Sequence, residues 1–139
     1  MSINAKQDEI VEEFELFDQW MDKYEYIIDL GKKLPLIDEA LKVEENLIPG
    51  CQSQVWLHAR MEDDTVEFTA DSDAIITKGI IALLIRVLSG ESPQSIAGSD
   101  LYFIDRIGLK EHLSPTRSNG LVSMVNKLKS IGVQFSQAQ

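Results

Sequence analysis

The chain has 139 residues, of which 44% are hydrophobic and 26% charged, and its formal net charge is −10. This length and apolar content are typical of one compact domain with its own core, so we expect a single domain over residues 1–139. The acidic balance argues against nucleic acid as the main partner, because phosphate binding needs clustered Lys and Arg side chains.

The chain has one cysteine, Cys51, and two histidines, and these counts exclude several kinds of site. A single cysteine cannot form an intramolecular disulfide. An iron–sulfur cluster or a structural zinc ion takes about four protein ligands, mostly cysteines and histidines. We therefore expect a single chain to hold no resident metal or cofactor and to be no cluster scaffold.

The sequence gives no sign of export or of membrane insertion. Its N-terminus leads directly into an acidic segment, without the apolar core of a signal peptide. The most apolar run, residues 74–88, is too short to span a bilayer and contains Lys78 and Arg86. We therefore expect a cytoplasmic protein that does not bind a membrane.

The N-terminal third is predicted to be helical. A first helix is indicated by apolar residues at helical spacing, namely Ile10, Phe14, Phe17 and Met21. A second helix is predicted from about Lys23 to near Gly31, and residues 36–41 are expected to form a further short helix.

The middle of the chain changes from helical to strand periodicity. Apolar and polar residues alternate over residues 54–61 and again over residues 65–70, which predicts two half-buried strands. The acidic residues 62–64 between them suit the turn of a hairpin. Residues 43–48 could add a short third strand.

The segment after the hairpin is predicted to be the central helix. Residues 71–73, Asp-Ser-Asp, are a helix-start signal, and residues 74–88 are apolar nearly all round. Gly90 is expected to close this helix. Gly79, inside it, is expected to allow close packing of the helix against the sheet.

The C-terminal part is predicted to contain three helices. Pro93 opens a short one, and residues 101–113 form another that breaks near Gly108. Residues 114–115, Ser-Pro, supply an N-cap and a proline at the first position of the last helix, which is expected to end at Gly132. Together the elements predict an α+β fold in which a small antiparallel sheet of about three strands has helices on one side.

Cys51 lies on a predicted loop that leads into the first clear strand. Pro49 and Gly50 form a turn signal directly before it. A thiol in such a position is well placed for chemistry, and Gly50 leaves room for another protein's active site to approach. The alternative is a small buried hydrophobic residue. No cationic residue lies within six positions, so a thiolate would need a distant cation, backbone N–H groups or a partner.

Three motifs carry most of the remaining information. They are residues 49–56 (PGCQSQVW), residues 71–73 (DSD) followed by Lys78 and Gly79, and residues 112–121 (HLSPTRSNGL). In order and spacing they resemble the SufE family, and the resemblance covers nearly the whole chain. No motif position departs from the pattern of that family.

The resemblance implies a sulfur carrier, not an enzyme with turnover of its own. SufE-like proteins accept sulfane sulfur from a PLP-dependent cysteine desulfurase of the SufS or CsdA type, so Cys51 is implied as the acceptor that becomes a persulfide. The sulfur then passes to an iron–sulfur assembly scaffold, and the carrier holds no PLP. The resemblance also implies that the loop shelters Cys51 at rest and exposes it on docking, with Gly50 as the hinge.

Two charged residues are candidate supporting residues. For Arg117 the resemblance implies a cation for the thiolate or persulfide, or a contact with the desulfurase; the alternative is surface solvation or a structural salt bridge. Asp73 could contact the desulfurase at the edge of the cysteine site, or it could cap the central helix or interact with the helix dipole in its first turn. Gly120 is unfavourable inside a helix and indicates either close packing against another backbone or an irregular helix start.

Two other functions remain as alternatives. A cysteine hydrolase would need a histidine base near Cys51, and the candidates are His58 and His112. A plain interaction module with an inert, buried Cys51 is the second alternative. The sequence leaves open which desulfurase is the partner, since SufE and CsdE serve different ones, and whether the chain is a monomer or a weak homodimer.

Overall fold

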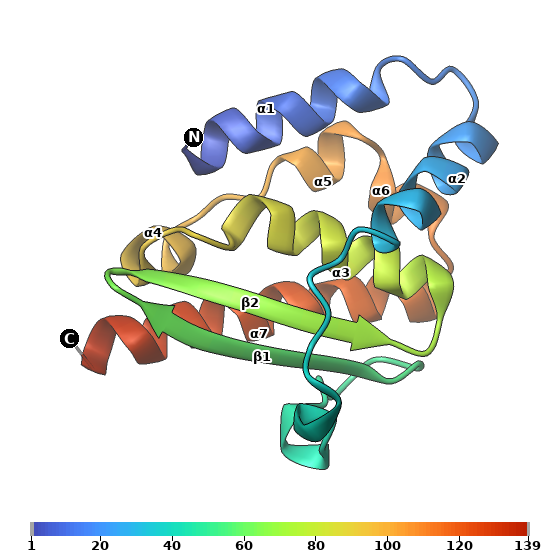
Figure 1. The fold of residues 1–139 in the computed structure, drawn as a ribbon. Coiled ribbons are helices and arrows are strands. Elements are labelled where there is room, and N and C mark those ends of the chain that lie inside the picture. The colour runs from blue at the N-terminus through green and yellow to red at the C-terminus, as the bar shows by residue number, and fades with distance from the viewer. Residues whose placement is uncertain (1, 139) are drawn as a thin grey trace.

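The computed structural model describes residues 2–138 and shows a mixed α+β fold, which confirms the predicted class (Figure 1). Its elements are α1 (Ile3–Phe14), α2 (Trp20–Gly31), the 3₁₀ helices η1 (Glu39–Leu41) and η2 (Glu44–Asn46), β1 (Val55–Glu62), β2 (Thr65–Ser72), α3 (Ile75–Leu88), α4 (Pro93–Ala97), α5 (Phe103–Arg106), α6 (Leu109–His112) and α7 (Pro115–Ala138). Within these residues, no helix combines the length and the apolar character needed to cross a membrane.

The two predicted strands form an antiparallel hairpin, β1–β2, with Val55 opposite Ser72 and Glu62 opposite Thr65. Asp63, in the two-residue turn between the strands, adopts a left-handed backbone with φ 56°, which Asp tolerates better than most residues. One face of the hairpin is buried against the helices through residues that the alternating pattern predicted: Val55, Leu57, Val66, Phe68 and Ala70.

The third strand considered for residues 43–48 does not form, and the described sheet has two strands. Residues 44–46 are a 3₁₀ turn instead, and Leu47 makes a single bridge to Trp56. The Asn46 side chain donates to the Leu41 carbonyl at 2.7 Å and so stabilises the turn. Pro49 follows directly and has no N–H for a ladder, which further disfavours a strand here.

The central helix α3 lies between the α1–α2 pair and the hairpin, and α7 runs behind the hairpin (Figure 1). Its crossing with α2 is very close, because a Cβ on Gly79 would collide with the Ile27 carbonyl oxygen and one on Gly31 would lie 2.9 Å from the Gly79 nitrogen. The close packing expected at Gly79 is therefore present, but against α2 and not against the sheet.

The first helix is shorter than predicted. It ends at Phe14, so Phe17 lies in the α1–α2 connection, and Met21 lies on α2 with 68% of its surface exposed. Phe17 finds its apolar contacts through aromatic rings, at 6.5 Å from Phe14 and 5.1 Å from Tyr26 between centroids. The spacing of the apolar residues is the same for one continuous helix as for a helix followed by an apolar connection, so the sequence pattern could not show where α1 ends.

The last helix begins as predicted but ends later. Ser114 Oγ accepts a hydrogen bond from Arg117 N at 3.3 Å, and Pro115 is the first helical residue. The helix continues past Gly132 to Ala138, so the predicted end is wrong. A Cβ on Gly132 would lie 2.9 Å from the Ala97 nitrogen, which shows that this glycine permits a close crossing with α4.

Candidate functional site

Residues 49–53, here called the Cys51 loop, connect η2 to β1 and are fixed at both ends. Before the loop, Ile48 N donates to the Val55 carbonyl at 2.9 Å. After it, Gln54 N donates to Asp73 Oδ1 at 3.0 Å, and Asp73 N donates back to the Gln54 carbonyl at 3.3 Å. The rigid hairpin thus sets where the loop begins and ends.

Asp73 does not cap the central helix, so that sequence-based alternative is wrong. The N-cap of α3 is Ala74, which makes no side-chain cap bond. The Asp73 carboxylate points to Gln54 instead, and Ser72 Oγ supports the same junction by donating to the Gln54 carbonyl at 2.8 Å. Asp73 therefore ties the end of the Cys51 loop to the β2–α3 connection.

The Cys51 thiol is half-buried and faces α7. Its Sγ donates to the Gly120 carbonyl oxygen at 3.6 Å, which is a weak hydrogen bond. Burial raises the pKa of the Cys51 thiol, because desolvation disfavours the charged thiolate. The resting thiol is therefore mostly protonated near neutral pH and is a poor nucleophile until its surroundings change.

Gly120 lies where the Cys51 loop contacts α7. A Cβ at this position would lie 3.6 Å from Cys51 Sγ and 3.8 Å from Cys51 Cα. The Cys51 loop therefore contacts α7 at this glycine, but at ordinary contact distances that do not themselves require glycine.

A cavity of about 340 Å³ lies beside the sulfur and brings three predicted site residues together. Cys51 comes from its loop, Asp73 from the β2–α3 connection and Arg117 from the first turn of α7. Apolar side chains of α3 and α7, including Ile80 and Met124, form part of the wall. The cavity thus combines a nucleophile with one carboxylate and one guanidinium.

The Arg117 side chain is exposed, and its Nη1 donates to the Tyr24 hydroxyl of α2 at 3.0 Å. Among residues 2–138, no carboxylate lies within ion-pair distance of it, so the structural salt bridge considered from the sequence is not found. Its positive charge remains available to an anion in the cavity.

Gly50 packs against α7 one helical turn beyond Gly120. Its φ of +88° lies in the left-handed region that favours glycine. A Cβ at Gly50 would overlap Ser123 Oγ and lie 3.3 Å from Ser123 Cβ. The backbone conformation therefore favours glycine here, and a Cβ would also force the Ser123 hydroxyl to move.

Sequence reasoning missed a pair of hydroxyl groups beside the site. Ser53 Oγ and Thr77 Oγ1 lie 3.1 Å apart, and Thr77 is only 6% exposed. Thr77 is the one uncharged polar side chain in the apolar run 74–88, and this was the signal that could have found it. Ser123, in contrast, is half-buried and has no local sequence signal that distinguishes it from the other serines of the chain.

The two histidines lie away from Cys51. His58 is paired with Thr69 in the hairpin, and the His112 ring stacks on Trp20 at 4.2 Å between centroids. Neither histidine lines the Cys51 cavity, so the geometry offers no base for a cysteine hydrolase. Across residues 2–138, no group of three His, Cys, Asp or Glu side chains could hold a metal ion.

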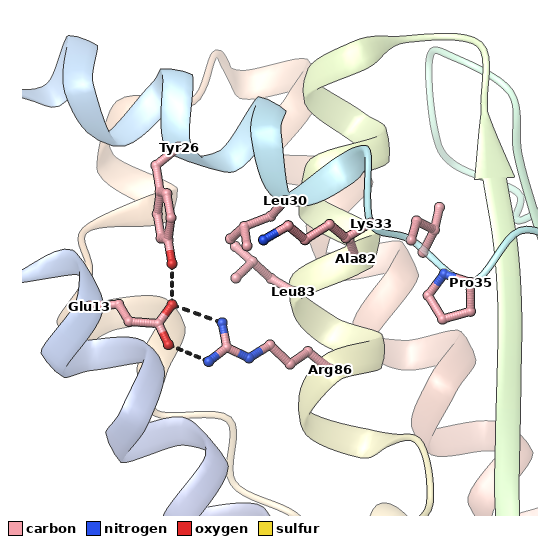
Figure 2. A pocket seen from close by; sticks show the side chains of 9 residues that line it. Glu13, Tyr26, Leu30, Lys33, Pro35, Ala82, Leu83 and Arg86 are labelled. Atoms are coloured by element: carbon pink, nitrogen blue, oxygen red, sulfur yellow. Dashed lines mark hydrogen bonds and ion pairs between the residues drawn. The ribbon is translucent and has the colours of Figure 1, made fainter.

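A second cavity, of about 540 Å³, lies between α1, α2 and α3 (Figure 2). Arg86 Nη1 donates to Glu13 at 2.9 Å, and the Tyr26 hydroxyl donates to the same carboxylate. Leu30 and Leu83 supply apolar wall. No residue predicted to act in the function lines this cavity.

Comparisons with known proteins agree with this fold. The family described as "SufE: Fe-S metabolism associated domain" matches residues 8–131. An uncharacterized SufE-like protein of Rhizobium meliloti is 43% identical over 128 residues, covering 88% of this chain and 91% of the relative. One of Rhizobium etli is 42% identical over 130 residues, covering 90% and 88%.

A solved structure has the same fold. The solution structure of a hypothetical protein from Thermus thermophilus aligns with a TM-score of 0.76 and 23% identity, over 93% of this chain and 94% of its own. The fold and the family match together define the class of protein: a small α+β domain associated with iron–sulfur metabolism. Its one cysteine lies on a loop. The chain belongs to the SufE family.

Proposed function

We propose that this protein accepts sulfane sulfur on Cys51 from a PLP-dependent cysteine desulfurase of the SufS or CsdA type and delivers it to an iron–sulfur assembly scaffold. The observation that carries the proposal is that the one thiol of a SufE-family chain lines a cavity together with the guanidinium of Arg117. The protein acts as a cytoplasmic carrier, as a monomer or weak homodimer, and residues 1–139 form a single functional domain.

The transfer is a thiol exchange. The Cys51 thiolate attacks the outer sulfur of the desulfurase cysteine persulfide, the S–S bond of the desulfurase breaks, and its cysteine leaves as a thiolate. Cys51 then carries the outer sulfur as a persulfide. The reaction needs no metal or cofactor on the carrier, and the carrier has no turnover without its partners.

The resting geometry suits a carrier that is activated on docking. Burial raises the pKa of the Cys51 thiol, so little thiolate is present before the loop moves. Arg117 supplies the positive charge that stabilises the thiolate or the persulfide, and Gly50 is the hinge of the movement. Asp73, exposed at the edge of the cavity, contacts the desulfurase.

The test is the intact mass of the protein after mixing with a cysteine desulfurase and L-cysteine, before and after addition of a reductant. The expected result is a gain of one sulfur on the wild-type protein that the reductant removes and that Cys51→Ser does not show. No gain with several active desulfurases would overturn the proposal. The half-buried thiol would then favour the interaction module, in which Cys51 serves packing alone.

A further inference from the structure

The Cys51 loop is held at few points between its ends. In the described chain, the two hydrogen bonds found for residues 49–53 both come from side chains, from Cys51 Sγ to Gly120 and between Ser53 and Thr77. A cavity lies on each side of the loop, about 340 Å³ towards α3 and α7 and about 450 Å³ between the loop and Glu44 of η2. A loop with open space on both sides has little packing to oppose its movement.

The remaining support comes from two small residues of α7. Gly120 lies under Cys51, where a Cβ would be 3.6 Å from the sulfur, and Ser123 lies under Gly50, where a Cβ on the loop would overlap its hydroxyl. Gly120 and Ser123 are three positions apart and so lie on the same face of the helix. In the part of the chain that the structure describes, the Ser123 hydroxyl makes no hydrogen bond, so its contact with Gly50 is steric.

We propose that Gly120 and Ser123 form a seat for the Cys51 loop, and that Ser123 is the positioning residue whose size sets how often the loop leaves that seat. This inference rests on the proposed sulfur-acceptor function, in which the seat keeps Cys51 sheltered while no desulfurase is docked. The position of the loop itself can be measured without any desulfurase.

The first test enlarges Ser123 without weakening the helix. Ser123→Leu introduces a good helix former whose added bulk must enter the space that the Gly50 backbone occupies. We expect Cys51 to react about tenfold faster with a maleimide that carries a polyethylene glycol chain, because crowding shifts the loop towards open states. The matched control is Ser130→Leu, the same change at an exposed position of α7.

The pH profile of the same reaction separates loop release from a general loss of stability. In the wild-type protein the rate rises at a pH above that of an ordinary cysteine, since burial raises the pKa of the thiol. In Ser123→Leu the profile should move down towards that of an exposed cysteine. The charged groups that line the two cavities, Asp73, Arg117 and Glu44, are the same in both proteins.

A double-mutant cycle tests the contact directly. Gly50→Ala should release the loop, by its unfavourable φ and by the overlap with Ser123. Adding Ser123→Ala removes the hydroxyl that causes the overlap and should restore part of the slow reaction with the maleimide. Full additivity of the two changes would overturn the seat, because backbone strain alone would then explain Gly50.

The two proposals fail in different ways. Equal maleimide rates and pH profiles for wild type, Ser123→Leu and Ser130→Leu, in proteins with unchanged circular dichroism, would overturn the seat even if the wild-type protein accepts sulfur. If Ser123→Leu does not fold, the alanine cycle decides alone. A wild-type protein that accepts no sulfur from a desulfurase would overturn the proposed function, while the maleimide result would still decide on the seat.

Discussion

The two cavities on either side of α3 differ in how their charged groups are paired. In the larger one, Arg86 and the Tyr26 hydroxyl both donate to the Glu13 carboxylate (Figure 2), and Arg86 also donates to Glu9. Lys33, which lines the same cavity, has no carboxylate within ion-pair distance among the described residues. In the smaller one, Arg117 has no carboxylate partner among the described residues, although it lies with Asp73 and the only cysteine of the chain. The larger cavity thus contains an ion-pair network around Glu13, and the smaller one contains no ion pair between its described residues.

The pKa values follow the same division. The hydrogen bond from Arg86 lowers the pKa of Glu13, and the pair with Glu13 raises the pKa of Arg86, so folding stabilises both charged forms. Burial raises the pKa of the Cys51 thiol without a compensating partner. The charged forms of Glu13 and Arg86 therefore contribute to the stability of the fold. The Cys51 thiolate does not, and it becomes more populated only when the surroundings of the thiol change. The larger cavity contains none of the residues predicted to act in the function, so cavity volume alone would not point to the proposed site.

If the two cavities differ in this way, the largest effect on sulfur uptake should come from replacing Cys51. Cys51→Ser should abolish sulfur uptake from a desulfurase, because a hydroxyl cannot form a persulfide, while the free energy of unfolding should stay within about 1 kcal/mol of wild type. Intact mass and urea unfolding measure the two quantities. Sulfur uptake by the serine variant would place the acceptor elsewhere.

In the larger cavity the effect should fall on stability alone. Arg86→Met keeps an apolar stem but leaves Glu13 and Glu9 without their cation, and the Arg86 side chain is only 30% exposed. We expect a loss of about 2 kcal/mol in the free energy of unfolding, since hydrogen bonds to charged groups contribute about 1.5–3 kcal/mol. Urea unfolding measures the loss. Reduced sulfur uptake by the folded variant would contradict the separation of the two cavities.

In the smaller cavity the removal of a cation should act on the reaction instead. Arg117→Ala should slow sulfur transfer about tenfold, because a charge-assisted contact to a thiolate contributes on the order of 1.5 kcal/mol. Its stability should change little, since the side chain is exposed and bonds only to Tyr24. Arg60→Ala is the matched control, an exposed arginine at the far end of β1. Equal rates for the two variants would remove Arg117 from the site.

Acid should remove the contribution that Glu13, in the larger cavity, makes to the free energy of unfolding. Because the folded pKa of Glu13 is lowered, its contribution to stability is present above the ordinary glutamate range and is lost as pH falls through the folded value. Wild-type stability should therefore drop more steeply below that range than the stability of Glu13→Gln. Glu12→Gln, a change at an exposed neighbour on α1, should follow the wild-type curve. Urea unfolding across the acid range gives the three curves, and parallel curves would contradict the prediction.

Local patterns in the sequence predicted the hairpin, the central helix and the start of α7, because each depends on residues close together in the chain. The end of α7 could not be predicted in this way. Gly132 is a frequent helix terminator, but here its lack of a side chain serves a crossing with Ala97 of α4. Whether a glycine ends a helix or lets a neighbour approach depends on a distant element, about which the local sequence holds no information.

The site shows the same limit. The motif resemblance identified Cys51, Asp73 and Arg117, and the structure brings them to one cavity. The contact of Ser123 with Gly50 depends on how α7 lies against the loop, so no spacing in the sequence could indicate it. For Asp73 the sequence left a cap of α3 open as an alternative, but the carboxylate accepts from Gln54 N, which only the folded hairpin brings near.

The smallest predicted effect is on the stability of α7 at Gly120, the glycine that leaves one side of the Cys51 sulfur uncovered. Glycine inside a helix is less stable than alanine by about 1 kcal/mol, so Gly120 lowers the stability of α7. The nearest atom to a Cβ at this position is Cys51 Sγ at 3.6 Å, an ordinary contact distance. Gly120→Ala should therefore stabilise the protein by about 0.5–1 kcal/mol. It should also slow the reaction of Cys51 with the maleimide, because the new methyl group covers one side of the sulfur.

Gly98→Ala, at a solvent-exposed helix end with only the Gln94 carbonyl within reach at 3.5 Å, controls for a general glycine effect. A destabilised Gly120→Ala would mean that the loop lies closer to α7 than its resting contacts indicate, and that the seat has no room even for one methyl group.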